Sequence, residues 1–236
     1  MFSAASRVIQ YNYPFSDANT GMNLESSDEK LMLEGKDLCC VRGARTLFNH
    51  LNFTLRAGEL LQVQGANGSG KTSLLRMLCG LTSAAEGEIC WDGAEIGGLG
   101  EAYRENLLYL GHHNAIQESL SARENLQATA ALAGVALNES EAGATLRRMG
   151  LLGREDLPVR FLSQGQKRRV ALARLMWSQA PLWVLDEPFV ALDTTALALL
   201  AGAIAGHLDG GGSVVLTSHQ IVEIAGRTAQ ILNLSA

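Results

Sequence analysis

The stretch LLQVQGANGSGKTSLLRML over residues 60–78 decides the fold of this chain. Residues 65–72 match the pattern G-x-x-x-x-G-K-S/T. The apolar run at residues 60–63 is typical of a strand buried in a parallel sheet. An amphipathic helix with leucines on one face is predicted to follow the loop and to end at Gly80. Strand, glycine-rich loop and helix in this order predict a phosphate-binding loop.

The chemistry of this loop follows from its residue types. Glycines let backbone N–H groups curl around phosphate oxygens, and the N-terminus of the helix adds positive potential. Lys71 is predicted to reach the β- and γ-phosphates, and the Thr72 hydroxyl to ligate Mg²⁺. The expected binding residues are Gly65, Ala66, Asn67, Gly68, Ser69, Gly70, Lys71, Thr72 and Ser73. They predict a site for a nucleoside triphosphate with Mg²⁺.

A second apolar run, at residues 182–185, ends in Asp186 and Glu187. A carboxylate at the tip of a buried strand is costly unless a cation or hydrogen bonds compensate, so Asp186 is the expected partner of Mg²⁺. Glu187 can polarise the attacking water as a general base. An apolar run that ends in acidic residues often only leads into a turn. Combined with the phosphate-binding loop, however, it indicates a P-loop nucleoside triphosphatase, a superfamily with many functions.

The remaining pattern predicts an α/β fold. Residues 214–216 form a third apolar run, after those at residues 60–63 and 182–185. Such runs are typical of parallel strands that helices cover on both faces. Residues 51–55 alternate as a half-buried antiparallel strand does, and residues 89–91 indicate a strand entering a tight turn. About residues 120–158 are rich in Ala, Leu and Glu and are predicted to be helical. We expect a mixed or parallel sheet core with an antiparallel β subdomain and a helical subdomain.

Residues 1–30 differ from the rest because they are polar and aperiodic. They are predicted to be a disordered arm. Alternatively, the start codon is mis-assigned and translation begins at Met32, which directly precedes the first ordered-looking strand. The four cysteines, at 39, 40, 79 and 90, form no C-x-x-C pair. Their expected role is that of small buried hydrophobic residues in a reducing compartment.

Composition narrows the class of protein. Apolar residues make up 47% and charged residues 18% of the 236 residues, as in a folded globular protein. The net charge of -5 argues against nucleic-acid binding. The longest apolar stretch, roughly residues 196–206, is shorter than the ~20 residues of a membrane-spanning helix, and no signal-peptide pattern opens the chain. We therefore expect the domain to fold in the cytosol and to reach a membrane only through a partner.

The segment LSQGQ at residues 162–166 narrows the superfamily to one family. Ser163 can cap a helix that is expected to begin near Lys167. The segment resembles the L-S-G-G-Q signature of ABC ATPases, with glutamine in place of the first glycine. In that family the signature Ser and Gly donate to the γ-phosphate of ATP bound on the opposite subunit. The resemblance implies this role for Ser163 and Gly165, with Gln166 beside them.

Two further marks of the family follow in order. Residues 191–193, ALD, resemble the D-loop that couples the two sites across the dimer, and His219 resembles the switch histidine that contacts the γ-phosphate. A lone histidine at a strand end is more often structural or solvated, but the order of motifs favours the switch role. The resemblance implies one ABC ATPase domain over residues 31–236, with a helical subdomain at about 112–165, that works as half of an ATP-sandwiching homodimer.

Two positions depart from the family pattern. Where the family usually has a glutamine that senses Mg²⁺ and the attacking water, this chain has His112 or His113, depending on loop length. Without further ligands at suitable spacing, the two histidines are not expected to form a metal or haem site. The aromatic residue that stacks on adenine is also absent, and Arg42 could stack its guanidinium plane on the base instead.

Several stretches around the motifs resemble one subfamily, the ATP-binding subunits of the haem exporter of cytochrome c maturation. They are residues 45–48, 57–60, 67–76, 168–175 and 185–189. The resemblance implies an integral-membrane partner subunit, a peripheral place on the cytoplasmic face of the bacterial inner membrane, and ATP turnover linked to haem export or to release of a haem-loaded chaperone.

Other functions remain as alternatives. The chain could be the ATPase subunit of another ABC transporter, which the sequence disfavours only by resemblance. A soluble non-transport ABC ATPase would normally carry tandem cassettes or long coiled-coil insertions, which this chain lacks. A non-hydrolysing scaffold would have lost Glu187 or Lys71, and both are present.

Overall fold

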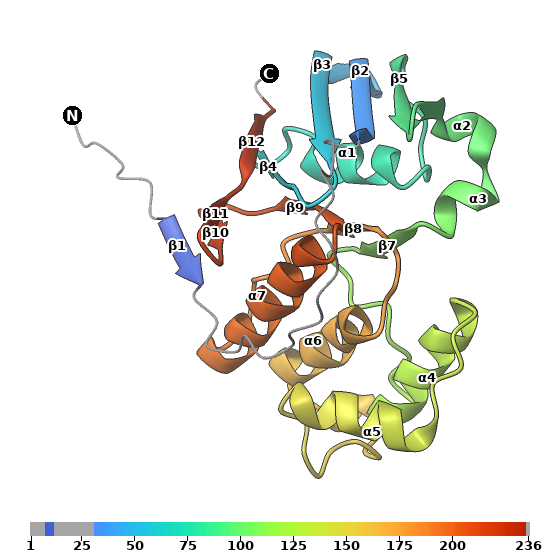
Figure 1. Cartoon of the computed structure of the whole chain (residues 1–236), viewed down its shortest axis with the longest axis vertical. Coiled ribbons are helices and arrows are strands. Elements are labelled where there is room, and N and C mark those ends of the chain that lie inside the picture. Colours follow the sequence, from blue (N-terminus) through green and yellow to red (C-terminus); the bar gives the residue numbers. More distant parts are fainter. Residues whose placement is uncertain (1–7, 12–30, 235–236) are drawn as a thin grey trace, which may run out of the picture.

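The computed structural model describes residues 8–11 and 31–234 of the chain. A parallel sheet lies in the middle, an antiparallel sheet and one helix cover one of its faces, and a group of helices covers the other (Figure 1). This arrangement confirms the predicted α/β fold with an antiparallel β subdomain.

The parallel sheet has the strand order β12-β4-β9-β8-β7, and all four pairings are parallel. Its strands are β4 (Leu60–Gln64), β7 (Leu107–Leu110), β8 (Leu182–Leu185), β9 (Ser213–Thr217) and β12 (Gln230–Asn233). Every residue of β8 and β9 is buried. The three apolar runs are thus confirmed as buried parallel strands. The prediction that helices cover both faces was wrong for one face, where the antiparallel sheet and one helix exclude water instead.

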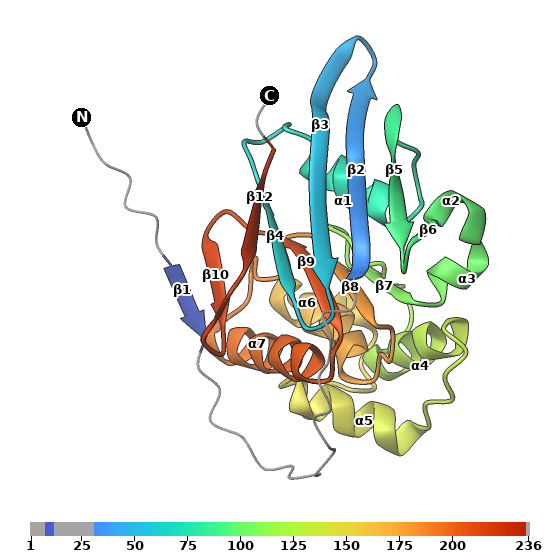
Figure 2. The ribbon, with the colours of Figure 1, turned by 45° about the horizontal axis from the view of Figure 1, so that its top comes forward.

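The antiparallel sheet has the order β3-β2-β5-β6. Its strands are β2 (Leu31–Arg42), β3 (Arg45–Arg56), β5 (Glu86–Trp91) and β6 (Ala94–Glu95). Strands β2 and β3 form a long hairpin (Figure 2). Strand β3 confirms the strand predicted at residues 51–55, and β5 confirms the one predicted at residues 89–91. Two short helices follow β6, namely α2 (Ile96–Leu99) and α3 (Glu101–Arg104).

Helix α1 (Lys71–Leu78) packs between the two sheets. Its Leu74, Leu75 and Leu78 are buried, so the predicted apolar face is confirmed. A Cβ on Gly70, directly before the helix, would lie 3.1 Å from atoms of Leu47 and Phe48. The β2–β3 hairpin therefore covers the beginning of α1.

The helices on the other face are α4 (Ala122–Leu132), α5 (Glu139–Arg148), α6 (Gln164–Leu172) and α7 (Thr194–Asp209), with short 3₁₀ turns at Val159–Phe161 and Ala173–Met176. Capping boxes begin α4, α5 and α6, each with two reciprocal side-chain to backbone hydrogen bonds. The box formed by Ser163 and Gln166 starts α6 at Gln164. This is earlier than the predicted start near Lys167, because a cap residue is followed at once by helical residues.

Two short strands lie beside the parallel sheet, β10 (Ile221–Ile224) and β11 (Arg227–Thr228). Strand β1 (Val8–Tyr11) pairs in parallel with β10, with Val8 opposite Ile221. This segment falls within residues 1–30, for which the sequence predicts a disordered arm. Pairing of its backbone with the edge of β10 accounts for the difference. The rest of residues 1–30 lies outside the described residues, so the predictions of a disordered arm and of a mis-assigned start codon stay predictions there.

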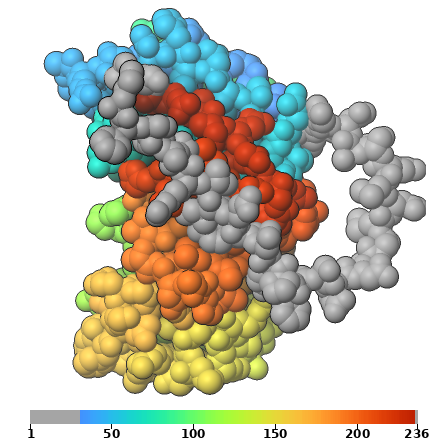
Figure 3. Space-filling view, turned by 90° about the vertical axis from the view of Figure 1, so that its left-hand side faces the viewer, coloured from blue at the N-terminus to red at the C-terminus, as the bar shows by residue number. Residues whose placement is uncertain are grey.

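The side chains of the parallel sheet alternate between two separate hydrophobic cores. Leu60, Trp183 and Val214 point into the core beneath the helices, whereas Leu61 and Val184 point into the core around α1. The space-filling view shows the resulting order of layers, from the blue antiparallel strands through the red strands to orange α7 and yellow α5 (Figure 3). Three of the four cysteines are buried, Cys39 is partly exposed, and all four are free thiols. None of the helices described is long and apolar enough to cross a membrane.

A histidine stacks on a tryptophan where α7 meets the sheet. The rings of His207 and Trp183 are almost parallel, with an interplanar angle of 7° and centroids 3.9 Å apart. Gly212 leaves room for the histidine, because a Cβ there would lie 2.2 Å from the ring. Burial lowers the pKa of His207 below its usual value.

This stack is expected to make stability depend on pH. The pKa of His207 is lower in the folded than in the unfolded chain, so acid favours unfolding. The stability that the neutral ring contributes is complete above the unfolded pKa of 6.5 and is lost as the pH falls from there through the folded pKa. His207→Phe keeps the stack and removes the titration. Urea unfolding at about pH 7.5 and about pH 5.5 should show a smaller loss of unfolding free energy in this variant than in the wild type. Equal losses would contradict the prediction.

Candidate active site

The phosphate-binding loop lies between the end of β4 and the beginning of α1. Gly65, Gly68 and Gly70 have φ angles of 154°, 81° and 104°. A Cβ on Gly65 would lie 2.4 Å from the Ser69 hydroxyl and 2.9 Å from the Leu234 carbonyl, so only glycine fits this close approach. No side chain of the described residues caps α1. Its first N–H groups therefore stay available to an anion, as expected for a phosphate site.

The charged side chain of the loop is folded back onto the loop itself. The Nζ of Lys71 donates hydrogen bonds to the carbonyl oxygens of Gly65 (2.8 Å) and Ala66 (3.2 Å), and the residue is 8% exposed. The Ser69 hydroxyl is buried and has no hydrogen-bond partner among the described residues. A buried hydroxyl without a partner is costly, and a phosphate oxygen in the loop would satisfy it. These features fit a bound polyphosphate.

Asp186 follows β8 and lies beside the first turn of α1. It is 3% exposed, and its carboxylate accepts hydrogen bonds from the hydroxyls of Thr72 (3.0 Å) and Thr217 (2.7 Å). Burial and, less strongly, the charge of Asp186 raise the pKa of Tyr109 to about 12. The structure thus brings together the two residues predicted to ligate Mg²⁺, and their oxygen atoms are the donors that this ion prefers.

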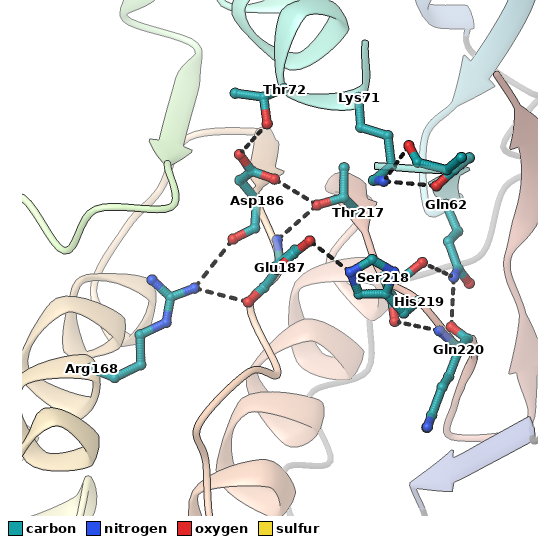
Figure 4. Close-up of polar contacts among 12 residues, drawn as sticks. Gln62, Lys71, Thr72, Arg168, Asp186, Glu187, Thr217, Ser218, His219 and Gln220 are labelled. Carbon is teal, nitrogen blue, oxygen red and sulfur yellow. Dashed lines mark hydrogen bonds and ion pairs between the residues drawn. The ribbon is translucent and has the colours of Figure 1, made fainter. Parts of the chain in front are cut away.

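Glu187 and His219 face each other at the ends of neighbouring strands (Figure 4). His219 Nε2 lies 3.0 Å from Glu187 Oε1, and the Glu187 N–H donates to the Thr217 hydroxyl (2.8 Å). Glu187 has a φ of 46°, a left-handed conformation that non-glycine residues rarely adopt. Both side chains line a pocket of about 250 Å³ together with Phe189, Val190, Leu197, Thr217, Ser218 and Gln220. Sequence reasoning did not single out Thr217, whose hydroxyl joins the two acidic residues.

Arg168, on α6, is a second residue that sequence reasoning did not assign to the site. Its guanidinium donates to the backbone carbonyls of Asp186 (3.3 Å) and Glu187 (3.1 Å), and also to Gly111 O (3.4 Å) and Asn114 Oδ1 (3.1 Å). Burial lowers its pKa, and the charges of the two carboxylates oppose this shift. Arg168 therefore ties the helix that follows Ser163 to the acidic residues and to the segment after β7.

The residues of the signature segment lie at the N-terminus of α6. Ser163 is exposed, and its hydroxyl accepts a hydrogen bond from the Gln166 N–H (3.3 Å), while Gly165 and Gln166 are partly exposed. Asp193 caps α7 through the Ala196 N–H and forms an ion pair with Arg169 of α6. The signature helix and the D-loop segment are thus joined directly.

His112 and His113 follow β7 and are both exposed. Their rings form a T-shaped pair with centroids 5.6 Å apart. Among the contacts of the described residues, neither ring has a hydrogen bond to Asp186 or Glu187. These residues also contain no cluster of three or more His, Cys, Asp or Glu that could hold a metal ion. The role of His112 or His113 in place of the family's glutamine stays a prediction.

Comparison with known proteins agrees with this geometry. The family model described as ABC transporter matches residues 48–190. The cytochrome c biogenesis ATP-binding export protein CcmA of Nitrosospira multiformis is 56% identical over 203 residues, which are 86% of this chain and 98% of that protein. The protein of the same name from Dechloromonas aromatica is also 56% identical, over 86% of this chain and 100% of that protein.

A solved structure extends the agreement to the fold. A putative ABC transporter ATP-binding protein from Pyrococcus furiosus superposes with a TM-score of 0.73 at 28% identity, over 85% of this chain and 96% of that one. Both the site and the relatives lead to one conclusion. The chain is an ATPase that belongs to the ABC transporter family, in the group of the cytochrome c biogenesis ATP-binding export proteins.

Proposed function

We propose that this ATPase powers the haem exporter of cytochrome c maturation as one half of an ATP-sandwiching homodimer. The observation that carries the hydrolytic part is an unbroken series of contacts from Thr72 through Asp186, Thr217 and Glu187 to His219. The series joins the end of the phosphate-binding loop to a general base and to the histidine beside it. The names of the relatives support the assignment to cytochrome c biogenesis.

Each residue has a definite task in this proposal. Lys71 exchanges the carbonyls of Gly65 and Ala66 for the β- and γ-phosphates of ATP. Thr72 and Asp186 would hold Mg²⁺, which would offset negative charge on the phosphates when bound. Glu187 accepts the proton of the attacking water. His219 leaves the Glu187 carboxylate and contacts the γ-phosphate.

The homodimer supplies what one copy lacks. Ser163 and Gly165 lie on the surface at the N-terminus of α6, where a second copy can present its ATP to them. Two ATP molecules are then enclosed between the phosphate-binding loop of one copy and the signature segment of the other. Hydrolysis removes the γ-phosphate that holds the copies together and reopens the dimer.

The motion of the dimer acts on an integral-membrane subunit. The ATPase binds that subunit at the cytoplasmic face of the bacterial inner membrane and reaches the membrane only through it. ATP turnover drives haem export or the release of a haem-loaded chaperone. Nucleic acid has no part in this function, in agreement with the net charge of -5.

A complementation experiment tests the proposal. The host is a bacterium that lacks its own cytochrome c biogenesis ATP-binding export protein. The wild-type chain is expected to restore c-type cytochromes with covalently attached haem, which haem staining of a denaturing gel detects. Glu187→Gln, expressed to the same level, is expected not to restore them. Restoration by this variant would contradict a need for hydrolysis. Failure of the wild type, despite co-purification with the host's membrane subunit, would contradict the assignment to cytochrome c maturation.

A further inference from the structure

A polar side chain lies in the middle of the parallel sheet. Gln62 is the third residue of β4, is 0% exposed, and pairs with Leu216 of β9 on one side and Ile231 of β12 on the other. Side chains alternate along a strand, so Gln62 shares the face of Leu60, which belongs to the core beneath the helices. Burial of an amide in such a core is costly unless all its hydrogen bonds are made.

All these hydrogen bonds go to one short backbone segment. The Gln62 Nε2 donates to the carbonyls of Gln220 (2.6 Å) and Ser218 (3.4 Å), and the Oε1 accepts from the Val222 N–H (2.9 Å). The acceptors of the first two bonds lie on either side of His219, as Figure 4 shows. Two carbonyls and one N–H match the two hydrogens and the oxygen of an amide in only one orientation.

The backbone of His219 needs such support because it lies between strands. Strand β9 ends at Thr217 and β10 begins at Ile221, so no strand ladder holds the residues between them. The ring of His219 is 56% exposed, and its contact with Glu187 depends on where the backbone places it. Gln62 provides backbone bonds at this point from a strand that continues directly into the phosphate-binding loop.

We infer that Gln62 is a positioning residue that fixes the backbone of His219, so that the ring reaches Glu187 and the γ-phosphate. The inference rests on the proposed role of His219. It gives β4 two tasks. The end of β4 positions the phosphate-binding loop. The buried amide of Gln62 positions the backbone of His219, on the other side of the phosphate. A small misplacement of a positioned group lowers turnover more than it lowers affinity for the substrate.

The first test compares Gln62→Leu with Ser213→Ala. Leucine fills the same space in the apolar core without hydrogen bonds. Ser213 is a matched control, because it is 0% exposed in the neighbouring strand and donates to Arg56 O (2.8 Å) at the opposite end of the sheet. With the full-length chain we expect Gln62→Leu to lower kcat by about 10-fold to about 100-fold and to leave the KM for ATP within about threefold. A kcat no lower than that of Ser213→Ala would overturn the inference.

The second test uses the pH profile of Gln62→Glu. An ionised carboxylate still accepts from Val222 but presents an oxygen to the carbonyls of Ser218 and Gln220, which repel it. Protonation restores one donor. The kcat of this variant relative to the wild type is therefore expected to rise as the pH falls from about 8 to about 6, because burial raises the pKa of the introduced carboxyl. A constant ratio would contradict a role for the donated hydrogen bonds.

The third test combines Gln62→Leu with His219→Ala. If the amide acts through the histidine, the double variant has the kcat of His219→Ala alone. A further loss equal to that of Gln62→Leu alone would overturn the inference and leave the role of His219 intact. If His219→Ala itself retains the wild-type kcat, the proposed role of the histidine fails, and the inference fails with it.

Discussion

Glu187→Gln is expected to lower the kcat of ATP hydrolysis by a factor of about 10³ while ATP still binds. Glutamine has nearly the same shape and can keep the backbone bond to Thr217, but it has no negative charge to accept a proton from water. The side chain is not needed to hold the phosphates. The variant should therefore accumulate in the ATP-bound state, in which the proposed dimer is closed.

Phosphate release and size-exclusion chromatography with ATP measure the two effects. Glu105→Gln, an exposed glutamate at the end of α3, is the matched control and should behave as the wild type. An ATP-dependent dimer of Glu187→Gln without turnover would agree with both the general base and the clamp. Unchanged turnover would exclude Glu187 as the base, and substitution of His112 and His113 would be the next experiment.

Lys71→Ala has the second largest expected effect, a loss of about 100-fold or more in kcat/KM. The ammonium group is the one side-chain cation of the loop sequence, and charge-assisted bonds to phosphate are stronger than neutral ones. The glycine conformations shape the loop, so we expect the fold to survive. Calorimetric titration with ATP and a turnover assay measure the loss. Lys36→Ala is the control, since Lys36 pairs with Glu34 and Glu88 on the antiparallel sheet. A kcat/KM within about threefold of the wild-type value would contradict the prediction.

The sequence predicted the parts of the site that depend on neighbours along the chain. The loop from Gly65 to Thr72 has its geometry encoded in consecutive glycines, and the strand that ends at Asp186 is encoded in consecutive apolar residues. The cap at Ser163 is likewise local, and only the start of its helix was placed too late.

Residues that support the site from distant parts of the chain, with no motif around them to mark their role, were not predicted. Gln62 bonds to residues that lie 156 to 160 positions away, and Arg168 bonds to Asn114 at a separation of 54. No periodicity relates such residues before the sheet order is known. A signal was nevertheless present, since Gln62 interrupts the otherwise apolar run at residues 60–63. Strand β1 was also not predicted, because its pairing depends on the edge of β10.

The alternation of the sheet between two cores has a consequence for how such proteins diverge. A change of volume at Leu60 or Val214 is felt by side chains beneath the helices, whereas one at Leu61 or Val184 is felt around α1. Compensating substitutions are therefore expected to fall within the same layer as the change they offset. A change in the helical layer can therefore leave the packing around α1 and the phosphate-binding loop unaltered. Chimaeras that exchange whole layers between relatives should thus tolerate more sequence difference than those that cut across them.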